Sequence, residues 1–449
     1  MRWTIFGLVG LVTLFGGIAP AIAGPETSLR PMPRGAVVAV QLTRADFAVT
    51  RSIRPEARRE VRQAQPTVQA TPVASNPTGF TRWARDFRAR ALRQGINGPT
   101  FDTAFARATY LPVVIERDRN QSEFSKQLWE YLDTAVSANR VQNGQRAYRQ
   151  YRSTLDAIER AYGVEGHVVA AIWGLETAYG AIRGDTNIIS AMATLAYEGR
   201  RKTFFEAQLI AALEILQSGD VTMAEMRGSW AGAMGHTQFM PDSYLRFAVD
   251  ATGDGKRDIW GDSPVDALAS TANYLRARGW TKGQPWGMEV RLPSGFDYSQ
   301  AGERIKKPAR DWNAMGVRRI DGGQVPEHGP SSVLVPAGSR GAAFVTYNNF
   351  HVIETYNPAD AYVIGVGHLS DRIRGGGAIQ ASWPRGDRAL SIGERRELQQ
   401  RLSSAGCPPG KYDGIVGPNT IEAVRCYQTR IGQVPDGYAS LALLRRLQG

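Results

Sequence analysis

Residues 168–180 read VVAAIWGLETAYG and contain a single acidic side chain, Glu176. At helical spacing this glutamate shares one face of a helix with three apolar residues, Val169, Ile172 and Trp173. Because desolvation disfavours a charged carboxylate, we expect a raised pKa for this side chain. A carboxylic acid that stays protonated near neutral pH can act as a general acid. The alternative is a helix-end glutamate that faces solvent or pairs with an arginine.

A second stretch, residues 228–244, reads GSWAGAMGHTQFMPDSY. Its glycines permit close approach of the backbone to another group. The amide of Gln238 and the apolar faces of Met240 and Tyr244 suit the N-acetyl groups and flat faces of amino sugars. Pro241 predicts the start of the next helix. The alternative is a tight turn between two helices.

These two stretches and residues 195–201, which read LAYEGRR, resemble the membrane-bound lytic transglycosylase B family in the same order along the chain. The resemblance covers residues 80–375. It implies a mainly α, lysozyme-like fold with extra domains. It also implies cleavage of the β-1,4 bond between N-acetylmuramic acid (MurNAc) and N-acetylglucosamine (GlcNAc). In this reaction a 1,6-anhydro ring forms and no water is added.

The resemblance also implies the roles of individual residues. Glu176 is expected to act first as the catalytic acid and then as the base. The expected substrate contacts come from Ser229, Gln238, Met240, Tyr244, Tyr356 and Asn357. The last two precede a helix that contains Tyr362. Two positions depart from the family pattern, since His236 stands where another polar or aromatic residue is expected and Asp242 replaces a common serine.

One carboxyl group suffices for this reaction, whereas glycosidases that add water use two. The 6-hydroxyl group of the muramoyl sugar replaces water as the attacking group, and the N-acetyl group can assist. A hydrolytic muramidase on the same fold is the nearest alternative. Its second carboxylate would come from Asp185 or Glu198, which otherwise are simple cap or ion-pair residues. A non-catalytic scaffold that binds peptidoglycan is the other alternative.

Residues 250–260 read DATGDGKRDIW and resemble the start of an EF-hand loop, although Gly261 stands where the bidentate glutamate belongs. Some members of the family bind calcium or sodium at a matching loop. The expected ligands of such a structural ion are Asp250, Thr252, Asp254 and Asp266, with Asp262 as a substitute for the last. The alternative is a self-capped turn without metal. No cofactor is expected to be required for the reaction.

The first residues predict export. A short basic start, an apolar run from Ile5 to Ile18 and small residues before position 24 are typical of a signal peptide, here residues 1–23. A membrane anchor is the alternative, but the run is shorter than the ~20 residues of a spanning helix. We therefore expect a periplasmic protein without a membrane span in its mature form. Residues 24–79, rich in Pro, Arg, Ala and Thr, predict a disordered linker.

Composition limits the possible partners. The formal net charge of +12 suits an anionic polymer, and export argues against nucleic acid. The five histidines form no HExxH motif or close His/Cys cluster in the sequence, which argues against a zinc hydrolase. The expected partner is peptidoglycan, with other cell-wall enzymes as further candidates.

The C-terminal residues 390–449 resemble the three-helix peptidoglycan-binding module of wall hydrolases. Asp-Gly turns at 413–414 and 436–437 separate its expected helices. The two cysteines of the chain, Cys407 and Cys426, both lie here. In an exported protein they suggest one local disulfide, with two buried free thiols as the alternative.

The expected domain order is a catalytic domain at 80–376, a linker at 377–389 and the C-terminal module. Trp83 and Phe87, four residues apart, mark the first helix of the catalytic domain. Further helices are expected at 120–137, 145–163, 165–179, 185–217, 241–249, 264–278 and 358–374. A small irregular or β subdomain is expected between 281 and 345, where Met288–Leu292 pairs with either Val333–Val335 or Ala343–Thr346.

Overall fold

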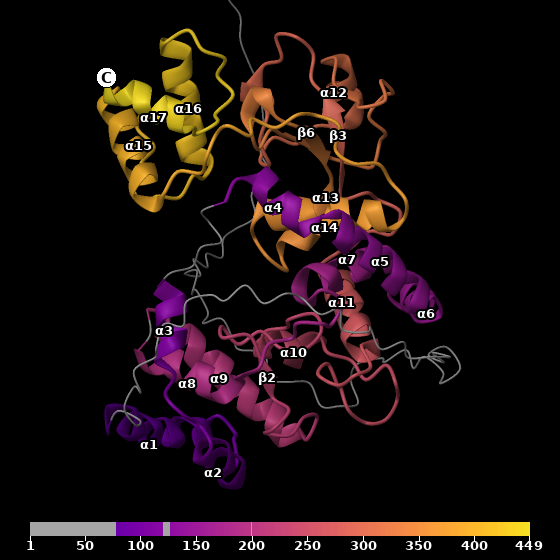
Figure 1. The fold of residues 1–449 in the computed structure, drawn as a ribbon, viewed down its shortest axis with the longest axis vertical. Coiled ribbons are helices and arrows are strands. Elements are labelled where there is room, and N and C mark those ends of the chain that lie inside the picture. The colour runs from indigo at the N-terminus through magenta and orange to yellow at the C-terminus, as the bar shows by residue number, and fades with distance from the viewer. Residues whose placement is uncertain (1–77, 120–125, 199) are drawn as a thin grey trace, which may run out of the picture. The chain divides into compact units, whose positions relative to one another are not determined.

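The computed structural model describes residues 78–119, 126–198 and 200–449 (Figure 1). The predicted signal peptide and nearly all of the predicted linker at 24–79 lie outside these residues. Within them, no helix has both the length and the apolar character needed to cross a bilayer.

The first half of the chain is helical. Its helices are α1 (Thr78–Arg93), α2 (Gly98–Ala106), α3 (Pro112–Arg119), α4 (Leu128–Ala135), α5 (Ala138–Gln150), α6 (Arg152–Tyr162), α7 (Gly166–Thr177), α8 (Ile188–Glu198) and α9 (Lys202–Ser218). The helices that follow, before the C-terminal module, are α10 (Pro241–Phe247), α11 (Val265–Ala277), α12 (Ala309–Ala314), α13 (Asn348–Glu354) and α14 (Asp360–Ile373). The expected mainly α fold is confirmed.

Helix α7 lies at the centre of the largest hydrophobic core and is buried on almost every side. It packs against α5, α6, α11 and α14. Its sequence explains this position, because small and β-branched residues at 168–172 allow neighbouring helices to approach from several directions. In α1, Trp83 and Phe87 are buried and their rings stack 5.2 Å apart, as their spacing predicts.

Two predicted helices are wrong as single elements. The expected helix at 145–163 is divided at Tyr151, which ends α5 and starts α6 with non-helical dihedrals of −102° and 23°. The expected helix at 185–217 is divided into α8 and α9, which pack side by side. Its first residues instead form strand β1 (Thr186–Asn187), which pairs with β2 (Arg227–Gly228). Pairing between segments distant in the sequence overrides local helical periodicity here.

The expected β subdomain is an antiparallel sheet in the order β4-β3-β6-β5. Its strands are β3 (Gly287–Arg291), β4 (Arg318–Arg319), β5 (Ser332–Leu334) and β6 (Ala343–Thr346). Strand β3 pairs with β6, so the second of the two predicted pairings is confirmed, and β5 pairs with the other edge of β6. A separate core around Trp312 and Tyr347 supports the sheet.

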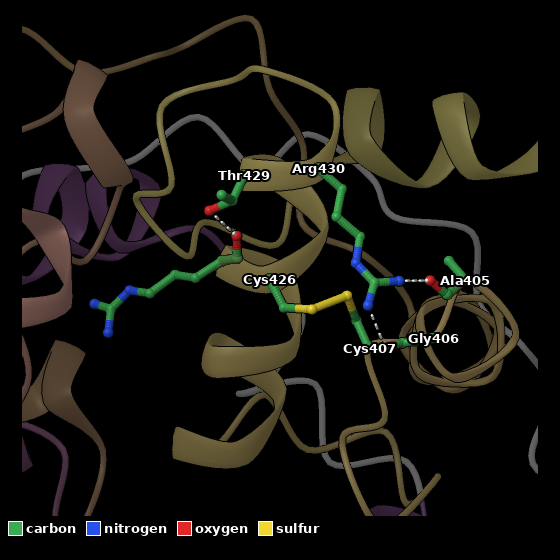
Figure 2. The surroundings of a disulfide bond; sticks show 7 residues. Ala405, Gly406, Cys407, Cys426, Thr429 and Arg430 are labelled. Atoms are coloured by element: carbon green, nitrogen blue, oxygen red, sulfur yellow. Dashed lines mark hydrogen bonds between the residues drawn. A yellow bond between two sulfur atoms is a disulfide. The ribbon is translucent and has the colours of Figure 1, made fainter.

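The C-terminal module consists of α15 (Ile392–Ser404), α16 (Pro418–Arg430) and α17 (Leu441–Gln448), as predicted. Its core is small and is built mainly from leucines. Cys407 and Cys426 form a disulfide that joins the loop after α15 to the middle of α16 (Figure 2). The guanidinium of Arg430 reinforces this connection by donating to the backbone oxygens of Ala405 and Gly406. The predicted disulfide is thus confirmed, and the alternative of free thiols is excluded.

Candidate active site

Glu176 lies in the last turn of α7 and is partly exposed. The hydroxyl group of Tyr362, on α14, donates a hydrogen bond of 2.6 Å to Oε1 of Glu176. Since α7 and α14 pack closely, the carboxyl group is held by a neighbouring helix. Burial raises the pKa of Tyr362 well above its ordinary value, and the nearby charge of Glu176 raises it further. Tyr362 therefore stays protonated and remains a donor.

The backbone directly after Glu176 has an unusual conformation. Ala178 and Tyr179 have φ values of 50° and 62°, and Gln238 in the facing loop has 56°. These are the non-glycine residues with left-handed backbone dihedrals in the described part of the chain. Such conformations cost about 1–3 kcal/mol each and cluster at functional sites. The two consecutive left-handed residues Ala178 and Tyr179 therefore make this end of α7 a candidate site.

The strained turn is held by Tyr179. Its hydroxyl group donates to the backbone oxygen of Arg140 at 2.9 Å, and its ring meets that of Trp173 edge to face. A Cβ at Gly174 would lie 2.5 Å from the ring of Tyr179, so only glycine allows this packing. Arg140 in turn donates to the backbone oxygen of Gly174. Together α5 and α7 fix the direction in which Glu176 points.

The 228–244 segment forms a compact loop before α10. Met234 forms isolated β-bridges with Gly228 and Phe239. A Cβ at Gly228 would lie 2.1 Å from the backbone oxygen of Ala233, which explains the glycine. Ser229 accepts a hydrogen bond from the backbone nitrogen of Ala233 at 3.0 Å. The loop is therefore more than a helix–helix turn, since it folds back on itself.

Three of the predicted substrate residues are partly exposed on this loop: Ser229, Gln238 and Met240. The amide nitrogen of Gln238 donates to the backbone oxygens of Gly235 and Arg183, at 2.9 and 3.2 Å. Its amide oxygen is thereby oriented away from these carbonyls. Met240 directly precedes α10, which begins at Pro241 as predicted.

His236 is not a surface residue, with 4% of its area exposed. Trp173 can only donate, so Nδ1 of His236 accepts its indole N–H at 3.2 Å. The backbone oxygen of Gly261 can only accept, so Nε2, 2.8 Å away, carries the proton. Burial lowers the pKa of His236 to about 4, which keeps the ring neutral. His236 therefore joins α7 to the end of the 250–260 loop, since its backbone nitrogen also donates to the oxygen of Ile259.

The segment before α14 closes another side of the site. The hydroxyl of Tyr356 donates to the backbone oxygen of Thr237 at 2.6 Å, which ties this segment to the 228–244 loop. Burial raises the pKa of Tyr356 well above its ordinary value, and the charge of Glu176 raises it further. Asn357 is partly exposed and its side-chain oxygen accepts from the backbone nitrogen of Ala359. The structure thus brings Tyr356 close to Glu176.

Tyr244 occupies a different position from the one its role as a sugar contact requires. It is 0% exposed, and its hydroxyl donates to the backbone oxygen of Arg257 at 2.6 Å. The guanidinium of Arg257 lies over the Tyr244 ring and forms an ion pair of 2.6 Å with the fully buried carboxylate of Asp220. This Asp220–Arg257–Tyr244 unit supports the 250–260 loop. Local sequence patterns do not reveal this unit, because Asp220 lies in a separate loop.

The 250–260 loop is capped by its own carboxylates. Asp250 accepts hydrogen bonds from the backbone nitrogens of Gly253 and Gly255, at 2.7 and 2.8 Å. Asp266, at the start of α11, accepts from the backbone of Ala251, Thr252 and Asp258. Burial raises the pKa of Asp266 to about 7, and the charge of Asp250 contributes.

The oxygen ligands of this loop are of the kind that a hard cation such as calcium prefers. The carboxylates of Asp250, Asp254 and Asp266 are not gathered within 4.8 Å of one another, and they accept backbone hydrogen bonds, as in a self-capped turn. Thr252 and Asp254 are also placed on this loop, and Asp254 is exposed. Asp262 is exposed and lies 3.8 Å from the guanidinium of Arg183.

The two acids considered as a second carboxylate lie elsewhere. Glu198 is at the exposed end of α8 and accepts a hydrogen bond from the hydroxyl of Tyr110. Asp185 is exposed before strand β1. Asp242 starts α10 and pairs with Arg246 one turn later.

The family of this chain follows from comparison with known proteins. The model of the transglycosylase SLT domain matches residues 79–371, which is more than half of the chain. The chain belongs to the SLT transglycosylase family. A model described as a putative peptidoglycan-binding domain matches residues 392–447. The lysozyme-like fold and the enzyme class expected from the sequence are thereby confirmed.

Individual relatives agree with this assignment. Membrane-bound lytic murein transglycosylase B of Escherichia coli K12 is 31% identical over 256 residues, which are 54% of this chain and 66% of that protein. The chain thus spans just under two thirds of this relative. SltB3 from Pseudomonas aeruginosa, solved with NAG-anhNAM-pentapeptide, is 50% identical with a TM-score of 0.81. The match covers 83% of this chain and 100% of that chain.

A third comparison is with a protein solved together with a metal ion. Slt35 of Escherichia coli, solved in complex with calcium, is 29% identical to this SLT transglycosylase with a TM-score of 0.57, over 65% of this chain and 92% of that chain.

Proposed function

We propose that Glu176 carries out both proton transfers of a lytic transglycosylase reaction on the MurNAc-β-1,4-GlcNAc bond of peptidoglycan. The observation that carries this proposal is the position of Glu176. It is a partly exposed carboxyl group on the central buried helix, held by Tyr362 and followed by two strained residues. A rigid and pre-oriented acid is what a glycosidic leaving group requires.

One carboxyl group is enough for both proton transfers of this reaction. Glu176 gives its proton to the bridging oxygen, the C1–O bond breaks, and the GlcNAc chain leaves with a free 4-hydroxyl group. The 6-hydroxyl of the muramoyl sugar attacks C1, and its proton passes to the carboxylate of Glu176. The ring closes as a 1,6-anhydro sugar, and the enzyme returns to its starting state. No water molecule is consumed.

The surrounding residues position the substrate and the acid. We assign sugar contacts to Ser229, Gln238, Met240, Tyr356 and Asn357, which are partly exposed around Glu176 or on the loop that Tyr356 joins to the site. Tyr362 positions the acid by its hydrogen bond. We now assign Tyr244 a supporting role, since it is completely buried under the 250–260 loop.

The 250–260 loop would hold a calcium ion with Asp250, Asp254 and Asp266 as carboxylate ligands and Thr252 as a further oxygen donor. The support is the ligand set itself and the calcium complex of Slt35. The ion would supply positive charge that stabilises the loop. Because His236 is hydrogen-bonded both to Trp173 of α7 and to Gly261 at the end of this loop, a more stable loop would also hold α7 in place.

We further propose that the chain is exported and acts in the periplasm. The support is the apolar N-terminal run and the disulfide, which fits an oxidising compartment. The division into a catalytic domain at 80–376 and a wall-binding module at 390–449 follows the separate cores of the two regions. The module would keep the enzyme near its polymeric substrate and raise the local concentration.

The decisive experiment is mass spectrometry of muropeptides released from purified peptidoglycan by the mature protein and by Glu176→Gln. Anhydro-muramoyl ends from the wild type, and from the matched control Glu198→Gln, but not from Glu176→Gln, are expected. Reducing muramic acid ends would instead establish a hydrolytic muramidase. Binding without any cleavage would establish a scaffold.

A further inference from the structure

Three side chains that could bind a metal lie outside the site described above. Glu303 belongs to a loop of the β subdomain, whereas His351 and Glu354 lie three residues apart on α13. The potential ligand atoms of all three lie within 4.8 Å of one another. Nδ1 of His351 is 3.0 Å from Oε2 of Glu354. We call these three residues the His351 cluster.

The His351 cluster carries more negative charge than its neighbours offset. Asp360, the first residue of α14, forms a side-chain hydrogen bond with Glu303. Burial raises the pKa of Glu303 to about 7, and the charges of Asp360 and Glu354 add to this effect. Within the described ranges, no ion pair joins Glu303, Glu354 or Asp360 to an arginine or a lysine. The charge of Lys306 acts on Glu303 and partly opposes the rise in its pKa. Among the described residues, the cation found at ion-pair distance from the cluster's carboxylates is His351, when it is protonated.

We propose that the His351 cluster binds a divalent metal ion of the Zn²⁺ type. One imidazole nitrogen and two carboxylate oxygens form a mixed ligand set that Zn²⁺ accepts, whereas calcium prefers oxygen ligands only. The fourth position would be taken by water or by Asp360, which adjoins Glu303. This ligand set therefore differs in kind from the all-oxygen set of the 250–260 loop.

The geometry is compatible with such an ion after small side-chain movements. Zinc ligands at roughly 2.0–2.2 Å from the metal in a tetrahedral site lie about 3.3 Å from one another. The separation of Nδ1 of His351 and Oε2 of Glu354 is already close to this value. Glu303 has to approach, and its partly exposed side chain and loop position leave it room to do so.

A metal here would connect three segments that converge near the active site. The loop of Glu303, helix α13 and the beginning of α14 would be joined through a single ion. Helix α14 also carries Tyr362, which bonds Glu176. The ion would thus fix the start of a helix that positions the catalytic carboxyl group. Metal binding itself does not depend on the proposed role of Glu176.

The test is isothermal titration of the full-length, untagged mature protein with Zn²⁺ after treatment with a chelator. We expect one site in the wild type and affinity weaker by roughly 10–100-fold or more in His351→Gln and in Glu354→Gln. His328→Gln, a matched control in the β subdomain, should bind like the wild type. Asp250→Asn should bind Zn²⁺ like the wild type as well.

Unchanged zinc affinity in both His351→Gln and Glu354→Gln would overturn the proposal, as would the absence of binding at millimolar Zn²⁺. Loss of zinc binding in Asp250→Asn alone would also overturn it, because the ion would then occupy the other loop. Circular dichroism of each metal-free variant checks folding. Since only binding is measured, failure here leaves the muropeptide test of Glu176 unaffected.

Discussion

The catalytic domain and the C-terminal module achieve their stability in different ways. The catalytic domain buries a large contiguous core that surrounds α7, and both cysteines lie outside it. The module has a core of a few leucines, an alanine and a valine, and a disulfide that closes a loop between two helices. Small domains bury a smaller share of their surface, so covalent cross-links contribute more to them.

The same contrast extends to local strain. The left-handed non-glycine residues of the described chain lie at the end of α7 and in the 228–244 loop, whereas the left-handed positions of the module are glycines such as Gly414 and Gly437. A large core can hold a strained backbone in place, and a small one cannot offset that cost. The strained positions near the candidate catalytic residue thus lie beside the largest hydrophobic core of the described chain.

The largest effect should come from the chemistry of the catalytic domain. Replacing Glu176 by Gln removes the proton that the leaving group needs, and we expect turnover to fall about 10²–10⁴-fold or more. Binding to insoluble peptidoglycan should remain, because the module is untouched. Turnover of defined glycan strands and a sedimentation assay measure the two properties separately. If the turnover of Glu176→Gln were within threefold of the wild type, Glu176 would not be the catalytic acid.

The second effect should be confined to the module. The double variant Cys407→Ser/Cys426→Ser should lose roughly 3 kcal/mol of stability in residues 390–449, because the unfolded chain is no longer cross-linked. Hydrogen exchange followed by mass spectrometry should show faster exchange in α15–α17 and unchanged exchange in α7. If hydrogen exchange in α7 became faster to the same extent, the two regions would unfold together. They would then not differ in how they are stabilised.

A smaller effect is expected from the support of the acid. Tyr362→Phe removes the hydroxyl that donates to Glu176, and we expect kcat to fall about tenfold, which corresponds to roughly 1.4 kcal/mol. KM should change little. Tyr347→Phe, which removes a hydroxyl bonded to Pro326 in the β subdomain, is the matched control. Equal kcat values for the two variants would assign Tyr362 a purely structural role.

The smallest effect concerns the start of α15. The side-chain hydrogen bond from Arg388, and then that from the backbone of Ser391, lower the pKa of Glu394 from 4.5 to about 2. Since the pKa is lower in the folded state, this stabilisation is complete above pH 4.5 and is lost as the pH falls toward 2. At pH 6, Glu394→Gln should destabilise the module by about 1 kcal/mol or less, because solvent screens the pair.

Urea unfolding of the wild type and of Glu394→Gln, followed by NMR of the amides of α15, tests this pH dependence. The difference between the two proteins should disappear between pH 4.5 and pH 2, the range set by the two pKa values. A difference that persists at pH 2 would show that charge is not its cause.

Local patterns in the sequence predicted those parts of the fold that depend on neighbouring residues. The helix that carries Glu176 and the start of α10 at Pro241 follow from spacing and residue type. For strand β3 the sequence left two partners open, and the structure decides for β6. The break at Tyr151 and the strand at Thr186 depend on contacts with distant segments, which periodicity does not reveal.

The same distinction applies to the site. The exposed positions of Ser229, Gln238 and Met240 agree with their expected roles, which remain to be tested. The burial of Tyr244 and His236 was not predictable, because an aromatic side chain in a loop can face either solvent or the core. The partners that bury them, Arg257 and Trp173, lie elsewhere in the chain.

The disulfide of the module also has a consequence for when the module becomes fully stable. Thiols stay reduced in a cytosol, and they pair only in an oxidising compartment. If the chain is exported as we propose, its catalytic domain can fold before export, whereas the C-terminal module gains its cross-link only afterwards. Full stability of the module would then depend on the redox state of the compartment that the chain has reached.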